Sequence, residues 1–321
     1  MEPDRDVPTP TTRLAFLSGL TRRAARAEPL PVPPAQPAAV AETAPELPPP
    51  GTLIEPYLCD DAFLEDVESA GQEDELHLWW LGQSGFLVQA EGEHLLLDPY
   101  LSDTLTEQYE GTVTPHERLT RRVIAPGRLS FVDVVTSSHG HTAHLDPGTL
   151  PGVLAGGAEL VCAAGSEALA EERSGRRPDA VLAAGDSVQI GRFHIEAVPA
   201  HHDDAPEAVG YLVKNGSVAL YHAGDTRRVQ GIAEAISRHA VDVAIVPVNG
   251  KFGNMDGADA ARLAHEARAR LAVPCHYEMF RCNTASPAGF VAECVRLRQE
   301  YRLCRAGERL TIRPLQLLLG D

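Results

Sequence analysis

The sequence has too little positive charge for a protein that holds nucleic acid. Its 28 lysines and arginines stand against 45 aspartates and glutamates, which gives a net charge of −17 over 321 residues. Binding to a phosphate backbone depends on clustered Lys and Arg side chains, and adhesion to anionic lipid depends on the same charge. The composition therefore argues against a nucleic-acid partner and against a surface that is held on a membrane.

Long apolar runs are also missing from the sequence. No run of 18 apolar residues occurs, so the sequence predicts no transmembrane helix. The short apolar stretch 14–20 is followed by Arg22, Arg23 and Arg26, whereas an export signal places its positive residues before the apolar core. This order predicts a cytoplasmic protein.

Several familiar motifs are absent as well. The six cysteines form no CxxC pair, and a chain of this length does not need disulfides to fold, so we expect reduced thiols. Neither a GxGxxG motif nor a Walker loop occurs, which argues against a nucleotide cradle. No internal repeat is present at the periods of repeat proteins.

Proline is concentrated at one end of the chain. Twelve of the 25 prolines lie before Gly51, and such a segment has few backbone donors and little to bury. We therefore predict a Pro-rich extension over 1–50, irregular over 29–50 and with a short helix over 12–26, and one folded domain over 51–321. The extension is either a flexible tail or an arm that docks on a neighbouring subunit of a homo-oligomer.

The folded part mixes two hydrophobic periods. Apolar strand patterns occur at 76–81, 86–90, 95–97, 131–137, 193–198, 209–213, 218–222, 241–246 and 271–274. Helical periodicity occurs at 166–174, 228–239, 258–270 and 287–300, and a helix is expected to begin at Asp146 and Pro147. Strand-rich stretches with interleaved helices predict an α/β fold in which helices cover sheets.

One histidine cluster carries most of the chemical information. His139, His141 and His144 stand in the spacing HxHxxH, directly after the apolar strand 131–137. Imidazole is the commonest side-chain ligand of transition metals. His139 and His141 alternate along an extended segment, so both can point the same way. The alternative is a polar loop that happens to contain three histidines.

Further ligand types follow later strands. The pair His201 and His202 comes after strand 193–198, Asp225 after strand 218–222, and His276 after strand 271–274. Each has an ordinary alternative, such as a loop histidine, a helix N-cap or a buried histidine. Together with HxHxxH, however, they predict one convergent site at the edge of a sheet.

The order and spacing of seven motifs resemble the metallo-β-lactamase fold superfamily. The motifs are WWLGQSGFLV (79–88), LLLDPYLSD (95–103), SSHGHTAHLD (137–146), VPAHHD (198–203), YHAGDT (221–226), NGKFGNM (249–255) and PCHYEMF (274–280). Within the superfamily, the sequence that flanks the ligand motifs is similar to that of the L-ascorbate-6-phosphate lactonase-like metal-dependent hydrolases. The resemblance implies an αββα sandwich with metals at one edge of the two sheets.

The resemblance also implies a set of metal ligands. It matches His139, His141 and His202 to one ion, with His201 as the fallback for His202, and it matches Asp225 to the carboxylate that bridges two ions. His144 and His276 match the ligands of the second ion. One or two divalent ions are thus expected; zinc or manganese is favoured, and iron is also compatible with histidine and carboxylate ligands.

One residue departs from the family pattern. The pattern HxHxDH has an aspartate where this sequence has Ala143, and that aspartate ligates the second metal and orients or deprotonates the attacking water. Ala143 can do neither. Three interpretations remain open: an engineered inactivation, a natural variant with one metal, or a relative that binds a ligand without turnover.

The expected substrate contacts surround these ligands. They are Gln83 and Ser84 in a glycine turn, His222 as a donor to a substrate oxygen, and Lys251, Tyr277, Arg281 and Asn283. Turn chemistry, packing or a solvated surface would explain each of them equally well.

The leading interpretation is a metal-dependent hydrolase of a small polar or anionic molecule. Two nearby cations can activate water, polarise a carbonyl or phosphoryl group and stabilise the leaving oxygen. Opening of a lactone or cyclic ester is the favoured reaction. The alternatives are a phosphodiesterase similar to the N-acylphosphatidylethanolamine phospholipase D-like proteins and a non-catalytic metal- or ligand-binding relative.

Overall fold

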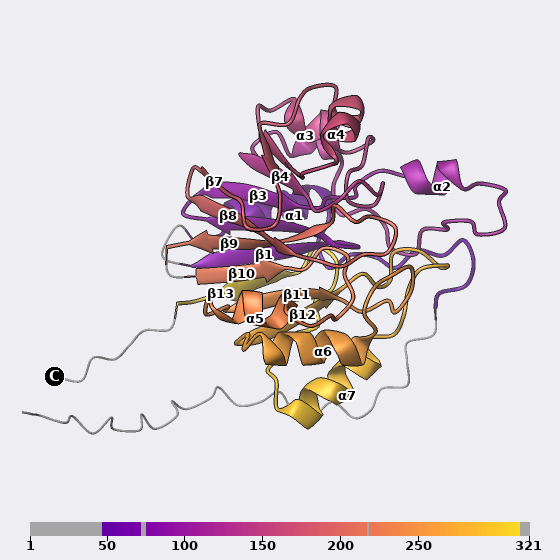
Figure 1. Cartoon of the computed structure of the whole chain (residues 1–321). Helices are drawn as coiled ribbons and strands as arrows, with labels where there is room; N and C mark the ends of the chain where they lie inside the picture. Colours follow the sequence, from indigo (N-terminus) through magenta and orange to yellow (C-terminus); the bar gives the residue numbers. More distant parts are fainter. Residues whose placement is uncertain (1–46, 72–74, 217, 315–321) are drawn as a thin grey trace, which may run out of the picture. The chain divides into compact units, whose positions relative to one another are not determined.

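The computed structural model describes residues 47–71, 75–216 and 218–314 (Figure 1). The helix expected over 12–26 and most of the irregular stretch expected over 29–50 lie outside these residues. At the start of the described part, the Pro48 carbonyl accepts a hydrogen bond from the Arg281 side chain at 2.7 Å. Among the described helices, none has the length and apolarity that a bilayer crossing needs.

The folded domain is built on two sheets. The first has the strand order β13 (Arg309–Ile312), β1 (Leu76–Gly82), β2 (Gly85–Ala90), β3 (Glu93–Leu97), β4 (Val134–Ser137), β5 (Glu159–Ala163) and β6 (Ala180–Leu182). The second has the order β12 (Leu271–Cys275), β11 (Val243–Pro247), β10 (Val218–His222), β9 (Val209–Asn215), β8 (Phe193–Pro199) and β7 (Ser187–Ile190).

Helices cover the outer faces of this pair of sheets (Figure 1). The helices of the described residues are α1 (Asp60–Glu68), α2 (Thr104–Gln108), α3 (Leu150–Leu154), α4 (Glu167–Ser174), α5 (Ile232–Ser237), α6 (Gly257–Glu266) and α7 (Ala288–Leu297). Of these, α2 covers neither sheet and stands away from both at the right of the view (Figure 1). Helix α4 contacts α3 and β5 of the first sheet, whereas α6 contacts β11 and β12 of the second sheet. The predicted α/β fold, an αββα sandwich, is confirmed.

The alternation of side chains along β1 explains the layers. Leu76, Leu78 and Trp80 belong to the large core between the sheets, where they join strand residues such as Ile195 of β8. Trp79, on the opposite face of β1, packs in a second core with residues of α1 and α3. Because successive strand residues point to opposite faces, one strand supplies both cores, and all seven of its residues are buried.

The predicted elements form, with shifted ends, but several others appear only in the structure. The strands β5, β6, β7 and β13 and the helices α1 and α2 were not predicted. The helix expected at Asp146 begins instead at Leu150. Its start moves because the Asp146 carboxylate accepts hydrogen bonds from Ser102, Thr104 and Thr149, which stabilise a turn before the helix.

Candidate metal centre

Four strand ends bring the candidate ligands together. His139 follows β4 of the first sheet, while His202, Asp225 and His276 follow β8, β10 and β12 of the second sheet. Strands β10, β11 and β12 are parallel, and β8 runs in the same direction because β9 is antiparallel to both β8 and β10. Their carboxyl ends therefore meet at one edge of the sandwich, as expected for a site built from distant segments.

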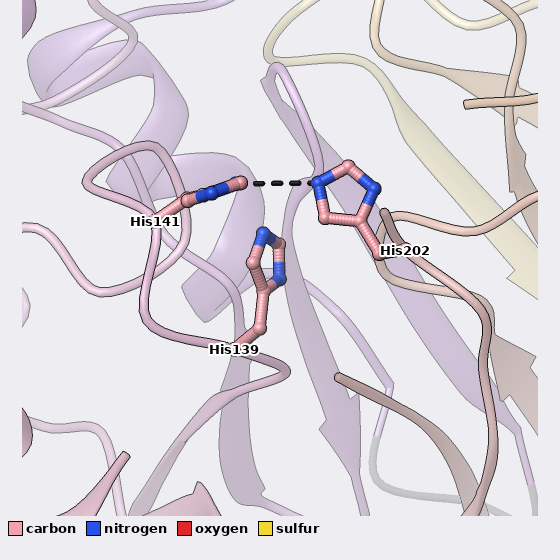
Figure 2. Close-up of side chains that lie close together, drawn as sticks. All are labelled: His139, His141 and His202. Carbon is pink, nitrogen blue, oxygen red and sulfur yellow. Dashed lines mark hydrogen bonds between the residues drawn. The ribbon is translucent and has the colours of Figure 1, made fainter. Parts of the chain in front are cut away.

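The first group of ligand atoms comes from His139, His141 and His202. One ring nitrogen from each residue lies within 4.8 Å of the others. Figure 2 shows the three imidazoles converging, and the shortest marked separation is 3.3 Å between His141 Nδ1 and His202 Nε2. His202 thus joins the cluster, whereas the side chain of His201 is 57% exposed and lies 3.9 Å from Asp203.

The second group contains Asp225. His139, His144 and Asp225 each offer one ligand atom within 4.8 Å of the other two. The Asp225 carboxylate also lies 3.3 Å from His144 Nε2, 3.3 Å from His276 Nε2 and 4.0 Å from His202 Nε2. The Asp225 carboxylate therefore lies between His202 on one side and the pair His144 and His276 on the other.

The polar atoms of this cluster fit a cation. Within the part of the chain that the structure describes, His139 Nε2, His144 Nε2 and Asp225 Oδ1 are buried and have no hydrogen-bond partner. Buried polar atoms are nearly always paired in folded proteins. Neutral imidazole and carboxylate are the side-chain groups that ligate zinc, manganese and iron. The donor set therefore matches a divalent metal ion.

The charge states of the first group suit this role. Burial, reinforced by the neighbouring His144, holds the pKa of His139 well below its usual range. The same two causes lower the pKa of His141. Both imidazoles are therefore neutral near pH 7, which is the form that donates an electron pair to a metal.

Asp225 and His144 shift each other's pKa at the centre of the cluster. Burial alone would lower the pKa of His144, but the carboxylates of Asp225 and Asp98 outweigh it and raise that pKa to about 10. Burial would likewise raise the pKa of Asp225, yet His276 and His144 hold it well below its ordinary value. The local field at this point favours positive charge beside an ionised carboxylate.

Asp98 orients two residues of the site, a role that the sequence analysis did not assign. Its carboxylate accepts hydrogen bonds from His144 Nδ1 at 2.7 Å and from the Ser138 amide at 2.8 Å. The Nδ1 contact leaves His144 Nε2 free to point at Asp225. Asp98 is fully buried and has a left-handed backbone with φ of 41°, a conformation that persists where the surroundings impose it. In the sequence, the motif LLLDP, which contains Asp98, was the feature that could have pointed to this role.

We expect Asp98→Asn to weaken metal binding by roughly 10–100-fold, the usual cost of losing a residue that orients a ligating histidine. The amide cannot accept all of these hydrogen bonds, so His144 loses its fixed orientation. Competition titration against a chelator of known affinity would measure the change. Asp61→Asn is the control, because that side chain is 84% exposed on α1. Equal metal affinity in both variants would contradict the role of Asp98.

Only part of the expected substrate set lines the cavity beside the cluster. This cavity has a volume of about 430 Å³, and Gln83 and Asn283 line it together with Ala143. The Gln83 amide nitrogen lies 2.7 Å from His276 Nε2, and the His276 amide donates to the Gln83 carbonyl at 2.9 Å. Both residues have left-handed backbones, with φ of 51° and 65°. Gln83 thus contacts a candidate ligand directly.

Ser84 and His222 differ from the expectation. The His222 Nε2 donates to the Ser84 carbonyl at 2.8 Å, and both residues are completely buried behind the cavity lining. Burial also lowers the pKa of His222, which keeps its ring neutral. These two residues connect β10 to the turn after β1 and are placed to support the site rather than to contact a substrate.

Tyr277, Lys251 and Arg281 also lie outside the cavity lining. Tyr277 packs its ring at 4.6 Å from Trp80 and donates its hydroxyl to the Cys304 carbonyl at 2.8 Å. The Lys251 ammonium donates to the Cys282 carbonyl at 3.1 Å. Arg281 pairs with Glu117 at 2.6 Å. Each of these side chains is occupied by a protein partner that sequence patterns did not indicate.

Ala143 sits among apolar side chains at the metal end of the cavity. It is 8% exposed and belongs to a small cluster with Tyr100, Leu105, Met279 and Phe280. Asp146 is the nearest acidic residue in the sequence, but its carboxylate accepts hydrogen bonds from Ser102, Thr104 and Thr149. Asp146 therefore does not replace the carboxylate that Ala143 lacks in the family motif.

The fold and the ligand cluster together define a metal-dependent hydrolase of the two-sheet sandwich class. The family model of the beta-lactamase superfamily domain matches residues 77–276. A UPF0173 metal-dependent hydrolase of Opitutus terrae is 30% identical over 249 residues, covering 74% of this chain and 100% of that protein. The chain belongs to the metallo-β-lactamase superfamily, among relatives that are named metal-dependent hydrolases.

Solved structures share the same fold. A metallo hydrolase of Ignicoccus hospitalis is 23% identical with a TM-score of 0.57, and the match covers 74% of this chain and 98% of that one. A possible metal-dependent hydrolase of Veillonella parvula is 15% identical with a TM-score of 0.61, covering 74% and 99%. The similarity to the L-ascorbate-6-phosphate lactonase-like branch stays a prediction.

Proposed function

We propose that this protein hydrolyses a lactone or cyclic ester with the help of a divalent metal ion. The convergence of His139, His141 and His202 beside the Asp225 carboxylate supports this proposal most strongly. A divalent ion in such a site polarises a carbonyl group and lowers the pKa of water toward about 7. The 430 Å³ cavity next to the cluster is large enough for a small substrate.

The chain's own residues divide into two sets in this proposal. His139, His141 and His202 would hold the first ion through their ring nitrogens, and His139 and His141 are neutral for the reasons given above. Asp225 is shared with a second position, where His144 and His276 are the remaining ligands. The Gln83 carbonyl keeps His276 in place by accepting a hydrogen bond from the His276 backbone amide. Because Ala143 removes one ligand from the second position, the first ion binds more tightly than the second. Zinc and manganese are the proposed metals, and iron is also compatible with these ligands.

An ester carbonyl is favoured over a phosphodiester as the reacting group. Lys251 and Arg281 were the cations expected to bind an anionic group of the substrate. In the structure, Lys251 donates to the Cys282 carbonyl and Arg281 pairs with Glu117. Arg173 does line the cavity, but one of its terminal nitrogens donates to the carbonyls of Gly140 and Leu145. The cavity also contains Asp204 in addition to Asp225. This arrangement suits a substrate of low charge.

A non-catalytic role is the second candidate, and Ala143 is the observation that favours it. A cavity that binds metal and ligand but lacks the aspartate of the family motif can retain a ligand without converting it. In that case the same residues bind the molecule, and turnover is absent even with the metal bound.

Metal removal and reloading would test the proposal. The full chain is stripped with a chelator, reloaded with zinc, manganese or ferrous iron, and assayed on matched panels of lactones and phosphodiesters. We expect slow lactone hydrolysis that disappears on stripping and returns on reloading. Hydrolysis confined to phosphodiesters would contradict the ester assignment. Metal binding without turnover of any substrate would favour the non-catalytic role.

A further inference from the structure

Four aromatic side chains line the cavity beside the metal centre, and none of them was among the substrate contacts expected from the sequence. Tyr109 and His116 come from the segment after α2, Phe252 from the loop after β11, and Phe280 from the segment after β12. We refer to these four residues as the aryl slot. The substrate expected from sequence was small and polar, so this lining needs an explanation of its own.

Three rings of the aryl slot form a row. The His116 ring lies 4.3 Å from the Tyr109 ring and 5.2 Å from the Phe280 ring, with interplanar angles of 38° and 71°. Phe280 continues the row to Tyr100, whose ring is 5.4 Å away. Tilted and edge-on contacts at these distances are the preferred geometries of aromatic pairs. Such a row presents ring faces and edges that match another flat ring.

The row is fixed in place by backbone pairing. Arg118 and Phe280 form an antiparallel bridge. On either side of it, the Leu119 amide donates to the Met279 carbonyl at 2.8 Å, and the Arg281 amide donates to the Glu117 carbonyl at 3.0 Å. The two segments that carry His116 and Phe280 are therefore bound to each other before any ligand arrives. A preformed surface of this kind lowers the entropic cost of binding.

Phe252 is the unusual member of the aryl slot. Its side chain is 58% exposed although it lines the cavity, and its backbone is left-handed with φ of 51°. A bulky residue in such a backbone conformation persists where the surroundings impose it, and such residues cluster at active sites and ligand clamps. The loop is closed by hydrogen bonds from the Gly250 amide to the Met255 carbonyl at 2.9 Å and from the Asn254 amide to the Lys251 carbonyl at 3.1 Å.

The same loop lies directly against the metal centre. A Cβ atom at Gly253, next to Phe252, would lie only 2.9 Å from His202 Nδ1. Only glycine allows this close approach, and its φ of 84° is also one that glycine adopts freely. The exposed Phe252 is thus held one residue away from a contact with a candidate ligand of the first ion.

From these contacts we infer that the substrate carries a flat, uncharged aryl group, which binds in the aryl slot while its hydrolysable bond lies over the histidine cluster. This inference rests on the proposed function for the reaction, but the binding of the ring does not depend on turnover. It narrows the substrate class to esters or lactones that bear an aromatic ring.

Binding of two neutral amides to the metal-loaded full chain would test the inference without a hydrolysis step. Benzamide and cyclohexanecarboxamide share the amide and differ in the flatness of the ring. Saturation-transfer NMR with competition would give both affinities. We expect benzamide to bind roughly tenfold more tightly, the order expected for an added aromatic contact. Equal affinities would overturn the inference.

Variants would locate the site of binding. Phe252→Ala should weaken benzamide binding by roughly tenfold, Phe252→Leu should remove the preference for the flat ring, and Phe252→Tyr should retain it. Val113→Ala is the matched control, because Val113 is 99% exposed on the segment that carries Tyr109 and does not line the cavity. Unchanged binding in Phe252→Ala would overturn the inference, as would an equal loss in Val113→Ala.

A parallel assay with aryl and alkyl lactones keeps the two proposals separate. Ring-selective binding without hydrolysis of any lactone would support the aryl slot and contradict the proposed reaction. Hydrolysis of both lactone classes at equal kcat/KM, without a ring preference in binding, would support the reaction and overturn the aryl slot.

Discussion

Replacing Ala143 with aspartate should raise the rate of hydrolysis by roughly 10²–10⁴, the contribution of a positioned acid–base group. The new carboxylate would stand at the metal end of the cavity, and it restores the ligand that the family motif has at this position. Occupancy of the second metal position should rise with the rate. Metal content by elemental analysis and lactone hydrolysis, measured on both chains, would check the two effects together.

The surroundings of Ala143 predict a second consequence of this substitution. Tyr100, Leu105, Met279 and Phe280 form an apolar cluster around it, and a carboxylate placed there without a cation loses its hydration. The melting temperature of the stripped Ala143→Asp protein should therefore fall, while the loaded protein should recover stability. Ala143→Asn controls for size, since it adds a similar volume without the charge. Full activity in the Ala143 chain, with no gain in the aspartate variant, would place the base elsewhere.

Loss of His202 should reduce metal affinity by more than the roughly 10–100-fold that follows loss of an orienting residue. His202 contributes a ring nitrogen to the first group, and its side chain is 1% exposed. His201→Ala is the matched control, because the two histidines are adjacent in sequence and only His202 reaches the cluster. Titration of each alanine variant with zinc and manganese would measure the difference.

The melting temperature measured in excess chelator shows whether a histidine variant has lost a metal ligand or has lost stability of the fold. His202→Ala should melt close to the parent chain when both are stripped, and it should lack the increase that the parent shows on adding metal. A loss of affinity in His201→Ala, with His202→Ala unaffected, would reverse the assignment of the third ligand.

The ligand cluster was predictable because each candidate ligand follows an apolar strand, and strands of both sheets end at the same edge of the sandwich. His139, His202 and Asp225 each follow an apolar strand, so the strand pattern already placed them together. The motif spacing chose His202 over its neighbour. The structure agrees with that choice, since the His201 side chain is largely exposed.

The surroundings of the cluster were not predictable in the same way, because they depend on partners from distant segments. Tyr277 follows His276 directly, but the left-handed backbone of His276 turns the chain and the Tyr277 hydroxyl reaches Cys304. The Arg281 side chain forms an ion pair with Glu117, which is distant in the sequence. His116 enters the cavity through the pairing of its segment with Phe280, and no local pattern encodes such a bridge.

The position of β13 has a consequence for how the chain folds during synthesis. The last strand pairs with β1, the first strand, from Leu76 opposite Ile312 to Trp79 opposite Arg309. The ribosome therefore releases β1, with this edge unpaired, long before its partner exists. An unpaired strand edge is a template for aggregation. The first sheet can be completed only after translation has reached the end of the domain, so until then this edge of β1 is open to pairing with other chains.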